Sequence, residues 1–228
     1  TRKGVQPYGV RFGADGWLLV PVRDASGNLW NVQRIAPDKP ASGTDKLFLK
    51  GARKAGLWHW CGDPAGAAVL LIAEGYATAA SLHQATGRPV AVAFDAGNLA
   101  HVAKALHKSY PSALLVLCGD DDLHTYARTG NNPGRDKATA AAQSVHGLAV
   151  FPEGLPEGGS DFNDLHHAAG FDAVRLIVDS AIDSFDPRQN APQATKATTA
   201  GKRGQSASRE GTGPQNAADS GNVFDRFF

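Results

Sequence analysis

The sequence has few cysteines, no methionine and no long apolar run. Its two cysteines, Cys61 and Cys118, form no C-x-x-C pair, so neither a disulfide framework nor a structural zinc site is indicated. The longest apolar stretches, residues 67–73 and 113–118, are far shorter than the roughly 20 residues that a membrane-spanning helix needs. The amino terminus carries no apolar signal sequence. We therefore expect a cytoplasmic protein with no membrane contact, and the missing initiator methionine is compatible with a fragment of a longer chain.

Charge of one sign is not in excess either. The formal net charge is +1, so the chain carries no global basic signature for nucleic-acid binding. The charges are nevertheless unevenly placed, because basic residues cluster within residues 46–54 and three aspartates are consecutive at 120–122. With 42% hydrophobic and 20% charged residues, the composition is typical of a globular protein with one core, or with one core plus a small additional unit.

The first part of the chain, residues 1–64, is predicted to form a small β-rich subdomain. A turn at residues 24–28, in which Gly27 can take a positive φ, joins two strand-like runs into a β-hairpin. A segment rich in Pro, Ser and Gly at residues 36–44 predicts a loop. The expected strands of this small antiparallel sheet are residues 17–22, 29–35, 46–50 and 57–60.

From residue 65 to 185, apolar strands alternate with helical segments. This alternation predicts an α/β fold in which a parallel sheet is flanked by helices. Asn98 and Asp161 stand where helix N-caps are expected. The expected strands are residues 67–73, 89–94, 113–118 and 148–151. The expected helices are residues 77–86, 99–109, 135–146, 162–168 and 172–184.

Beyond residue 185 the composition changes sharply. Residues 186–222 contain almost no large apolar side chains, so this segment cannot bury enough surface to offset the entropy of ordering it. We therefore expect residues 186–228 to be a disordered tail. Its apolar end, residues 223–228, is either a docking peptide, the start of a further element or a frayed terminus.

An abrupt change from apolar to charged residues marks Glu74 as the first candidate site residue. The apolar strand that ends at Ala73 is followed at once by Glu74, Gly75 and a helical segment. Such a carboxylate lies at the carboxyl edge of the sheet, where open α/β folds bind their ligands. On this stretch alone, the alternative is an acidic residue that simply faces water.

Three consecutive aspartates follow the strand at residues 113–118. Adjacent carboxylates repel one another, and a bound cation offsets that repulsion. In an extended or turning backbone, Asp120 and Asp122 point to the same side and form an Asp-x-Asp chelate, whereas Asp121 points away. Oxygen ligands without His or Cys suit Mg²⁺. The alternative is a solvated loop or a helix N-cap.

A further pair of oxygen donors, Asp161 and Asn163, lies at the start of the helix expected at residues 162–168. Taken alone, Asp161 is more simply explained as the N-cap of that helix. Together with Glu74 and the aspartate pair, however, it completes a set of acidic sites at the ends of α/β elements. These sites can converge on one crevice.

These motifs resemble the Toprim domain shared by bacterial-type primases, topoisomerases and certain nucleases. The resemblance rests on Glu-Gly after one strand, Asp-x-Asp after a later strand, and an Asp-containing site before a helix. The run Gly-Arg-Asp-Lys-Ala-Thr-Ala-Ala-Ala at residues 134–142 is similar to a Gly-Arg-x-Ala-Ala stretch of primases. The motifs Glu-Gly-Tyr-Ala-Thr-Ala at residues 74–79 and Asp-Phe-Asn-Asp-Leu-His at residues 161–166 are most similar to those of the Toprim primases of plasmids and phages. Residues 16–179 are covered, and the β-rich part looks like the subdomain that precedes Toprim in those enzymes.

The resemblance implies a Toprim-like sheet over residues 65–185 and the activity of a DNA primase. That activity is the synthesis of short RNA primers on single-stranded DNA, in the replication or transfer of a plasmid, phage or mobile element. It implies Mg²⁺, or Mn²⁺ in its place, as cofactor, and single-stranded DNA and ribonucleoside triphosphates as partners. A replicative helicase or further domains of a larger polypeptide would work beside it in a bacterial cytoplasm.

By the same resemblance, Glu74, Asp120 and Asp122 are the expected catalytic residues and metal ligands, with Glu74 alternatively a general acid/base. Asp161 and Asn163 would help to hold a second metal ion or the triphosphate. The residues expected to contact nucleic acid or nucleotide are Arg34, Lys46, Lys50, Arg53, Lys54 and Lys137. The alternative for each of these is a solvated surface charge, and Lys137 could instead pair with the aspartates.

The sequence departs from the primase pattern in specific places. It lacks the zinc-ribbon module with which many such primases begin, and it has no phosphate-binding loop for a fused helicase. Asp121 replaces the glycine of the usual Asp-Gly-Asp, which leaves the chelating pair intact and makes the loop more acidic. Two rival functions stay open: a Toprim nuclease with the same acidic residues, and a non-catalytic nucleic-acid-binding module of a larger conjugative or replicative protein.

Overall fold

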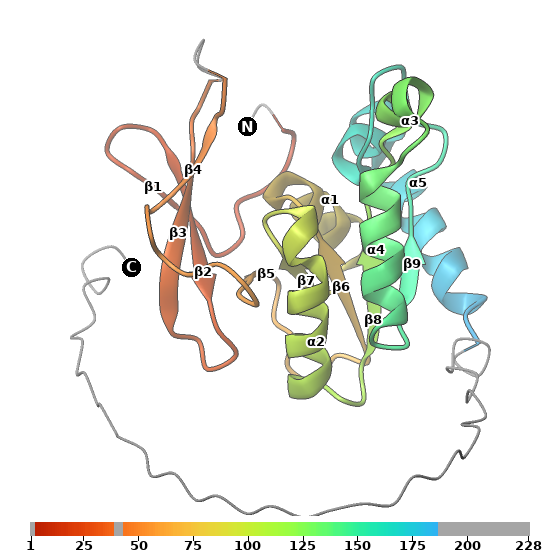
Figure 1. The fold of residues 1–228 in the computed structure, drawn as a ribbon, viewed down its shortest axis with the longest axis horizontal. Helices are drawn as coiled ribbons and strands as arrows, with labels where there is room; N and C mark the ends of the chain where they lie inside the picture. The colour runs from red at the N-terminus through yellow and green to blue at the C-terminus, as the bar shows by residue number, and fades with distance from the viewer. Residues whose placement is uncertain (1–2, 39–42, 187–228) are drawn as a thin grey trace, which may run out of the picture. The chain divides into compact units, whose positions relative to one another are not determined.

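The computed structural model describes residues 3–38 and 43–186. Within these ranges the strands form two sheets, one of four strands in the order β1-β2-β3-β4 and one of five strands in the order β5-β7-β6-β8-β9 (Figure 1). The tail predicted at residues 186–228 lies, after Asp186, outside the described residues. Part of the predicted loop, residues 39–42, lies outside them as well.

The four-stranded sheet is antiparallel throughout and is built around the predicted hairpin. The carboxylate of Asp24 organises the turn, because it accepts hydrogen bonds from the backbone N–H groups of Ser26 and Asn28 and from the indole of Trp30. Gly27 takes a φ of +83°, which a residue with a side chain rarely adopts. The strands are β1 (Arg11–Phe12), β2 (Leu18–Arg23), β3 (Leu29–Ile35) and β4 (Lys46–Phe48).

The five-stranded sheet contains the predicted parallel strands and one antiparallel edge strand. The edge strand is β5 (His59–Cys61), which pairs with β7. Of the strand predicted at residues 57–60, Trp58 does pair antiparallel with Arg23 of β2, but the residues from His59 onward join the other sheet. A strand of three residues carries too little pattern to reveal its partner, and its pairing is decided by tertiary contacts. The parallel strands are β6 (Val69–Ala73), β7 (Val90–Val92), β8 (Leu114–Cys118) and β9 (Leu148–Val150).

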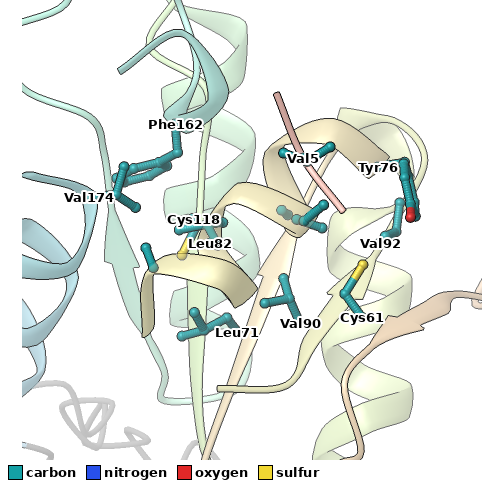
Figure 2. Close-up of a cluster of buried hydrophobic side chains, with 14 of the residues drawn as sticks. Val5, Cys61, Leu71, Tyr76, Leu82, Val90, Val92, Cys118, Phe162 and Val174 are labelled. Carbon is teal, nitrogen blue, oxygen red and sulfur yellow. The ribbon is translucent and has the colours of Figure 1, made fainter. Parts of the chain in front are cut away.

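Helices cover both faces of the five-stranded sheet, as the alternation predicted (Figure 1). On one face, α1 (Tyr76–Thr86) and α5 (Phe162–Asp183) bury their apolar side chains with one set of strand residues. On the other face, α2 (Leu99–Ser109) and α4 (Pro133–Gln143) do the same with the alternate set. Figure 2 shows the first of these cores, in which Leu71, Leu82 and Phe162 from a strand and two helices are all buried.

Two local predictions about helix ends have different outcomes. Asp161 caps α5, because its side chain accepts hydrogen bonds from the N–H groups of Asn163 and Asp164. Asn98 does not cap α2 with its side chain, and Asp95 instead caps the short 3-10 helix Ala96–Asn98. The predicted break within α5 is confirmed, since Gly170 has a φ of +84° and separates two helical parts.

Three short elements were not predicted, namely β1, the 3-10 helix Ala96–Asn98 and α3 (Leu123–Thr129). In the described ranges, every helix is too short or too polar to cross a membrane.

Candidate active site

A cavity of about 360 Å³ opens where the carboxyl edge of the five-stranded sheet meets the four-stranded sheet. Glu74 follows β6 directly, and Asp120 follows β8 by two residues, so the parallel strands bring both carboxylates to the same edge. Asp161, at the start of α5, lines the cavity with them. Lys46 of β4 lines it from the four-stranded sheet. The predicted convergence of the acidic sites on one crevice is therefore seen for these residues.

The carboxylates of the cavity influence one another electrostatically. The pKa of Asp120 is raised to about 8, first by burial and then by the negative charges of Glu74, Asp161 and Asp122. The pKa of Glu74 is also raised, chiefly by burial, while the charge of Lys46 acts in the opposite direction on both groups. The cavity is lined by four carboxylate side chains, those of Asp45, Glu74, Asp120 and Asp161, and by two lysines, Lys3 and Lys46, and this excess of acidic groups favours a cation there.

Asp161 caps α5, as the simpler interpretation of the sequence predicted, and it also lines the cavity. Its Oδ1 caps α5, whereas its Oδ2 accepts a hydrogen bond of 3.0 Å from the hydroxyl of Thr78 on α1. The carboxylate is thus fixed between two helices and also lines the cavity. A cap that is held in this way presents a carboxylate to the cavity in a single orientation.

Asn163 does not line the cavity. It is fully buried, and its Nδ2 donates hydrogen bonds to the backbone oxygen of Lys3 and to the hydroxyl of Ser81, both at 2.9 Å. Asp161 and Asn163 do not present their side chains to the same side, because Asn163 lies in the first turn of α5, and residues two apart in a helix point in different directions. Its contacts indicate that it anchors the amino-terminal segment.

Asp122 is not among the residues that line the cavity, and its side chain is held by the start of α4. Its Oδ2 accepts a hydrogen bond of 3.0 Å from the N–H group of Gly134. Its charge raises the pKa values of Asp120 and Glu74, so it lies within electrostatic reach of both. The predicted pairing of an aspartate with Lys137 is replaced by an ion pair of 2.8 Å between Arg135 and Asp121.

The other predicted basic residues lie outside the cavity lining. Arg34 forms an ion pair of 2.6 Å with Asp15, and Lys54 is paired with Asp95. Arg53 lies over the ring of Trp30 at 5.1 Å. Three of the predicted residues, Lys50, Arg53 and Lys137, are exposed and lie away from the cavity.

Several cavity residues were not predicted. Lys3 and Gln6 come from the amino-terminal segment, which no local pattern could connect to a site so distant in the sequence. Thr78 lies in the first turn of α1, four residues after Glu74, and this closeness in sequence was the available signal. Phe94 lines the cavity with an unusual φ of +73° for a non-glycine residue, and its ring meets Phe48 of β4 edge to face at 5.7 Å.

The acidic residues fit a divalent cation in the chemistry of their donors. Asp120 Oδ1 is buried and has no hydrogen-bond partner within the described ranges, so it is available as a ligand. In residues 3–38 and 43–186, no group of three or more His, Cys, Asp or Glu side chains is arranged as a ready-made metal centre. Mg²⁺ does not require one, because it usually keeps several waters and takes oxygens from one or two carboxylates and the substrate.

Fold and site together define an α/β domain with an acidic site at the carboxyl edge of its sheet, beside an antiparallel sheet that supplies a lysine. Comparison with known families identifies the domain more closely. Residues 69–172 match the family described as a Toprim domain, and this segment of the chain is a Toprim domain.

Relatives of known sequence are primases. The chain is 46% identical over 155 residues to DNA primase TraC of Escherichia coli, a match that covers 66% of this chain and 10% of that protein. A second DNA primase TraC of the same organism is 44% identical over 155 residues, with 66% of this chain and 14% of that protein covered. The chain therefore spans a small part of the length of the curated relatives that it matches.

Two solved structures share the fold. The Aquifex aeolicus primase, comprising its zinc-binding and RNA polymerase domains, is 16% identical with a TM-score of 0.50, and 72% of this chain and 40% of that chain are covered. A chain in the structure of bacteriophage T7 lagging-strand DNA polymerase with primase domains, an RNA/DNA hybrid and dTTP is 16% identical with a TM-score of 0.52. That match covers 72% of this chain and 78% of the other. The described residues thus adopt the fold of primase catalytic cores.

Proposed function

We propose that this chain is the catalytic core of a DNA primase that synthesises short RNA primers on single-stranded DNA. The observation that carries the proposal is the joint lining of one cavity by Glu74, Asp120, Asp161 and Lys46. Nucleotidyl transfer brings a hydroxyl in line with an α-phosphate and leaves charge on the departing pyrophosphate. An acidic cavity that can hold cations, with a lysine on its opposite wall, suits that chemistry.

The carboxylates are proposed to hold Mg²⁺, or Mn²⁺ in its place, which would neutralise the phosphates during transfer. Asp120 and Asp122 are the chelating pair, and Glu74 completes the ligand set or moves a proton. Asp161 orients a second cation or the triphosphate, because Thr78 and its cap bonds fix its carboxylate. Asn163 supports the cavity from behind through its bond to the Lys3 backbone.

The predicted basic residues are proposed to contact the template and the incoming nucleotide. Lys46 is placed to meet a nucleotide phosphate, since it lines the cavity itself. The residues proposed to follow the phosphates of a single strand outside the cavity are Arg34, Lys50, Arg53, Lys54 and Lys137.

The larger context is proposed from the relatives, which are much longer primases. Residues 1–64 and 65–185 are taken as the β-rich subdomain and the catalytic Toprim domain of one core. Other domains of a longer polypeptide, or a replicative helicase, would supply unwinding in the cytoplasm.

Primer synthesis by the purified chain tests the proposal. The chain is incubated with single-stranded DNA, Mg²⁺ and labelled ribonucleotides, and short labelled RNA products are expected. The double variant Asp120→Ala, Asp122→Ala is expected to lose at least 100-fold of this activity, on the order of the loss when a key electrostatic group is removed. Asp63→Asn, an exposed aspartate outside the cavity, is the matched control.

The products discriminate between the competing functions. Shortened template in place of RNA would identify a Toprim nuclease, and retention of DNA without either product would identify a binding module. Priming that survives in the double variant would refute the assignment of the chelating pair.

A further inference from the structure

Asp121, the middle residue of the three aspartates, is buried although it is charged, with 5% of its surface exposed. Its carboxylate is satisfied by three hydrogen bonds from the region around the start of α4. Arg135 donates a hydrogen bond from Nη2 to Oδ2 at 2.8 Å and one from Nε to Oδ1 at 3.3 Å. Asn132 donates to Oδ1 at 2.6 Å from Nδ2. Asp121 is therefore neutralised by the protein, whereas Asp120 keeps an unpartnered oxygen.

Asn132 extends this contact to the next aspartate. Its Oδ1 accepts hydrogen bonds from the backbone N–H group of Asp122 at 3.1 Å and from that of Arg135 at 3.2 Å. The same side chain therefore caps α4, binds Asp121 and holds the backbone of Asp122. Gly134 adds a hydrogen bond to the Asp122 carboxylate. A Cβ at Gly134 would lie 2.6 Å from the backbone oxygen of Asp120, so this approach requires glycine.

Asp121 and Arg135 also connect the acidic loop to the rest of the site. The guanidinium of Arg135 lies over the ring of Phe151, just past β9, at 4.2 Å. The backbone N–H group of Asp121 donates a hydrogen bond of 2.7 Å to the backbone oxygen of Ser160, the residue before Asp161. Buried Asp121 thus connects its own loop, which carries Asp120 and Asp122, to the loop that carries Asp161.

We infer that Asp121, clamped by Arg135 and Asn132, is a positioning residue that orients Asp120 and Asp122 toward a divalent cation. A free third carboxylate would repel its neighbours, and the clamp removes that repulsion and fixes the backbone on both sides. The residue that replaces the usual middle glycine is thereby a rigid support in this chain. The inference rests on the proposed function, because it takes Asp120 and Asp122 as metal ligands.

Cation binding in Asp121→Asn tests the inference directly. Mn²⁺ binding is measured by titration calorimetry, and the unfolding temperature is measured with EDTA and with Mg²⁺. Residues that support metal ligands typically contribute 10–100-fold to affinity, and we expect a loss in this range. Priming by this variant should recover at high Mg²⁺, with little change in the KM for nucleotides. Asp136→Asn, an exposed change of the same type in the first turn of α4, should keep the wild-type affinity.

A second variant and a metal-free measurement separate positioning from a general loss of structure. Arg135→Lys keeps the charge but cannot form the two-pronged contact, so its affinity should also fall. In EDTA, amide hydrogen exchange of residues 119–123 should be faster in both clamp variants than in Asp136→Asn. If Asp121→Asn binds Mn²⁺ like the wild type, or if its activity is lost at every Mg²⁺ concentration, the inference is wrong.

The outcome is independent of whether the chain makes primers. A wild-type chain that binds Mn²⁺ but makes no RNA would contradict the proposed function, while weaker binding in both clamp variants would still support the positioning role. A wild-type chain that binds no divalent cation at the site would overturn both.

Discussion

Replacing Asp120 with asparagine should stabilise the metal-free chain at neutral and alkaline pH. The pKa of Asp120 is raised from 3.8 to about 8 by burial and by the neighbouring carboxylates. Between these pH values the folded state keeps a proton that the unfolded state has released, so the stability of the chain falls as the pH rises from about 4 to 8. Asparagine does not ionise, so the variant does not lose stability in this way as the pH rises.

The size of the effect follows from the pKa shift. A shift of about four pKa units corresponds to a ceiling of about 5 kcal/mol. The asparagine amide still lacks a full set of partners, which costs about 1–3 kcal/mol. We therefore expect Asp120→Asn to raise the free energy of unfolding by about 2–4 kcal/mol at pH 8, which corresponds to roughly 4–16 °C in Tm for a domain of this size.

Thermal unfolding in EDTA from pH 4.5 to 8.5 measures this effect, with Asp63→Asn as control. Near pH 4.5 the Tm of Asp120→Asn should be equal to or below that of the wild type, and it should rise above the wild-type Tm as the pH increases toward 8. Added Mg²⁺ should stabilise the wild type more than Asp120→Asn. If Asp120→Asn is less stable than the wild type at pH 8 in EDTA, or if the difference does not depend on pH, the description of the acidic cavity is wrong.

Three further variants test separate parts of the site. Gly134→Ala places a Cβ 2.6 Å from the Asp120 backbone oxygen, so priming should fall at least 10-fold. The control is Gly130→Asn, at a helix end where φ is +73° and no atom lies within 4 Å of an added Cβ, and it should leave activity near wild type. Lys46→Gln should raise the KM for nucleotides several-fold with a smaller change in kcat, as steady-state kinetics would reveal; an unchanged KM would remove Lys46 from the nucleotide site. Asn163→Ala should destabilise the chain by about 1–3 kcal/mol in urea unfolding, because it leaves Ser81 and the Lys3 backbone without a buried donor, and unchanged stability would contradict the anchoring role.

The convergence of Glu74 and Asp120 could be predicted because it depends on few facts. Both residues follow apolar runs that pair as neighbouring parallel strands, β6 and β8, and parallel strands end at a common edge. Asp161 could be predicted for the same reason, since a cap before a helix that covers the sheet lies at that edge. The local chemistry of strand ends and helix caps therefore carries most of the acidic site.

The remaining contacts depend on tertiary structure that no local pattern encodes. Asn163 binds the backbone of Lys3 across 160 positions of sequence. An ion pair between Lys137 and the aspartates was one alternative, but α4 begins at Pro133, and Arg135 pairs with Asp121 instead. The basic residues of the 46–54 cluster were predicted as one group. Because β4 ends at Phe48, Lys50, Arg53 and Lys54 lie beyond that strand, and within the cluster only Lys46 lines the cavity.

Template-directed incorporation on a homopolymer tests the central claim most directly. The wild-type chain is given oligo-dT or oligo-dC, Mg²⁺ and one labelled ribonucleotide at a time, and the length and composition of the products are determined. A primase core predicts ATP incorporation on oligo-dT, GTP incorporation on oligo-dC, and neither in EDTA. Incorporation that ignores the template, or a template that is shortened while no RNA forms, would contradict the assignment of this acidic cavity to primer synthesis.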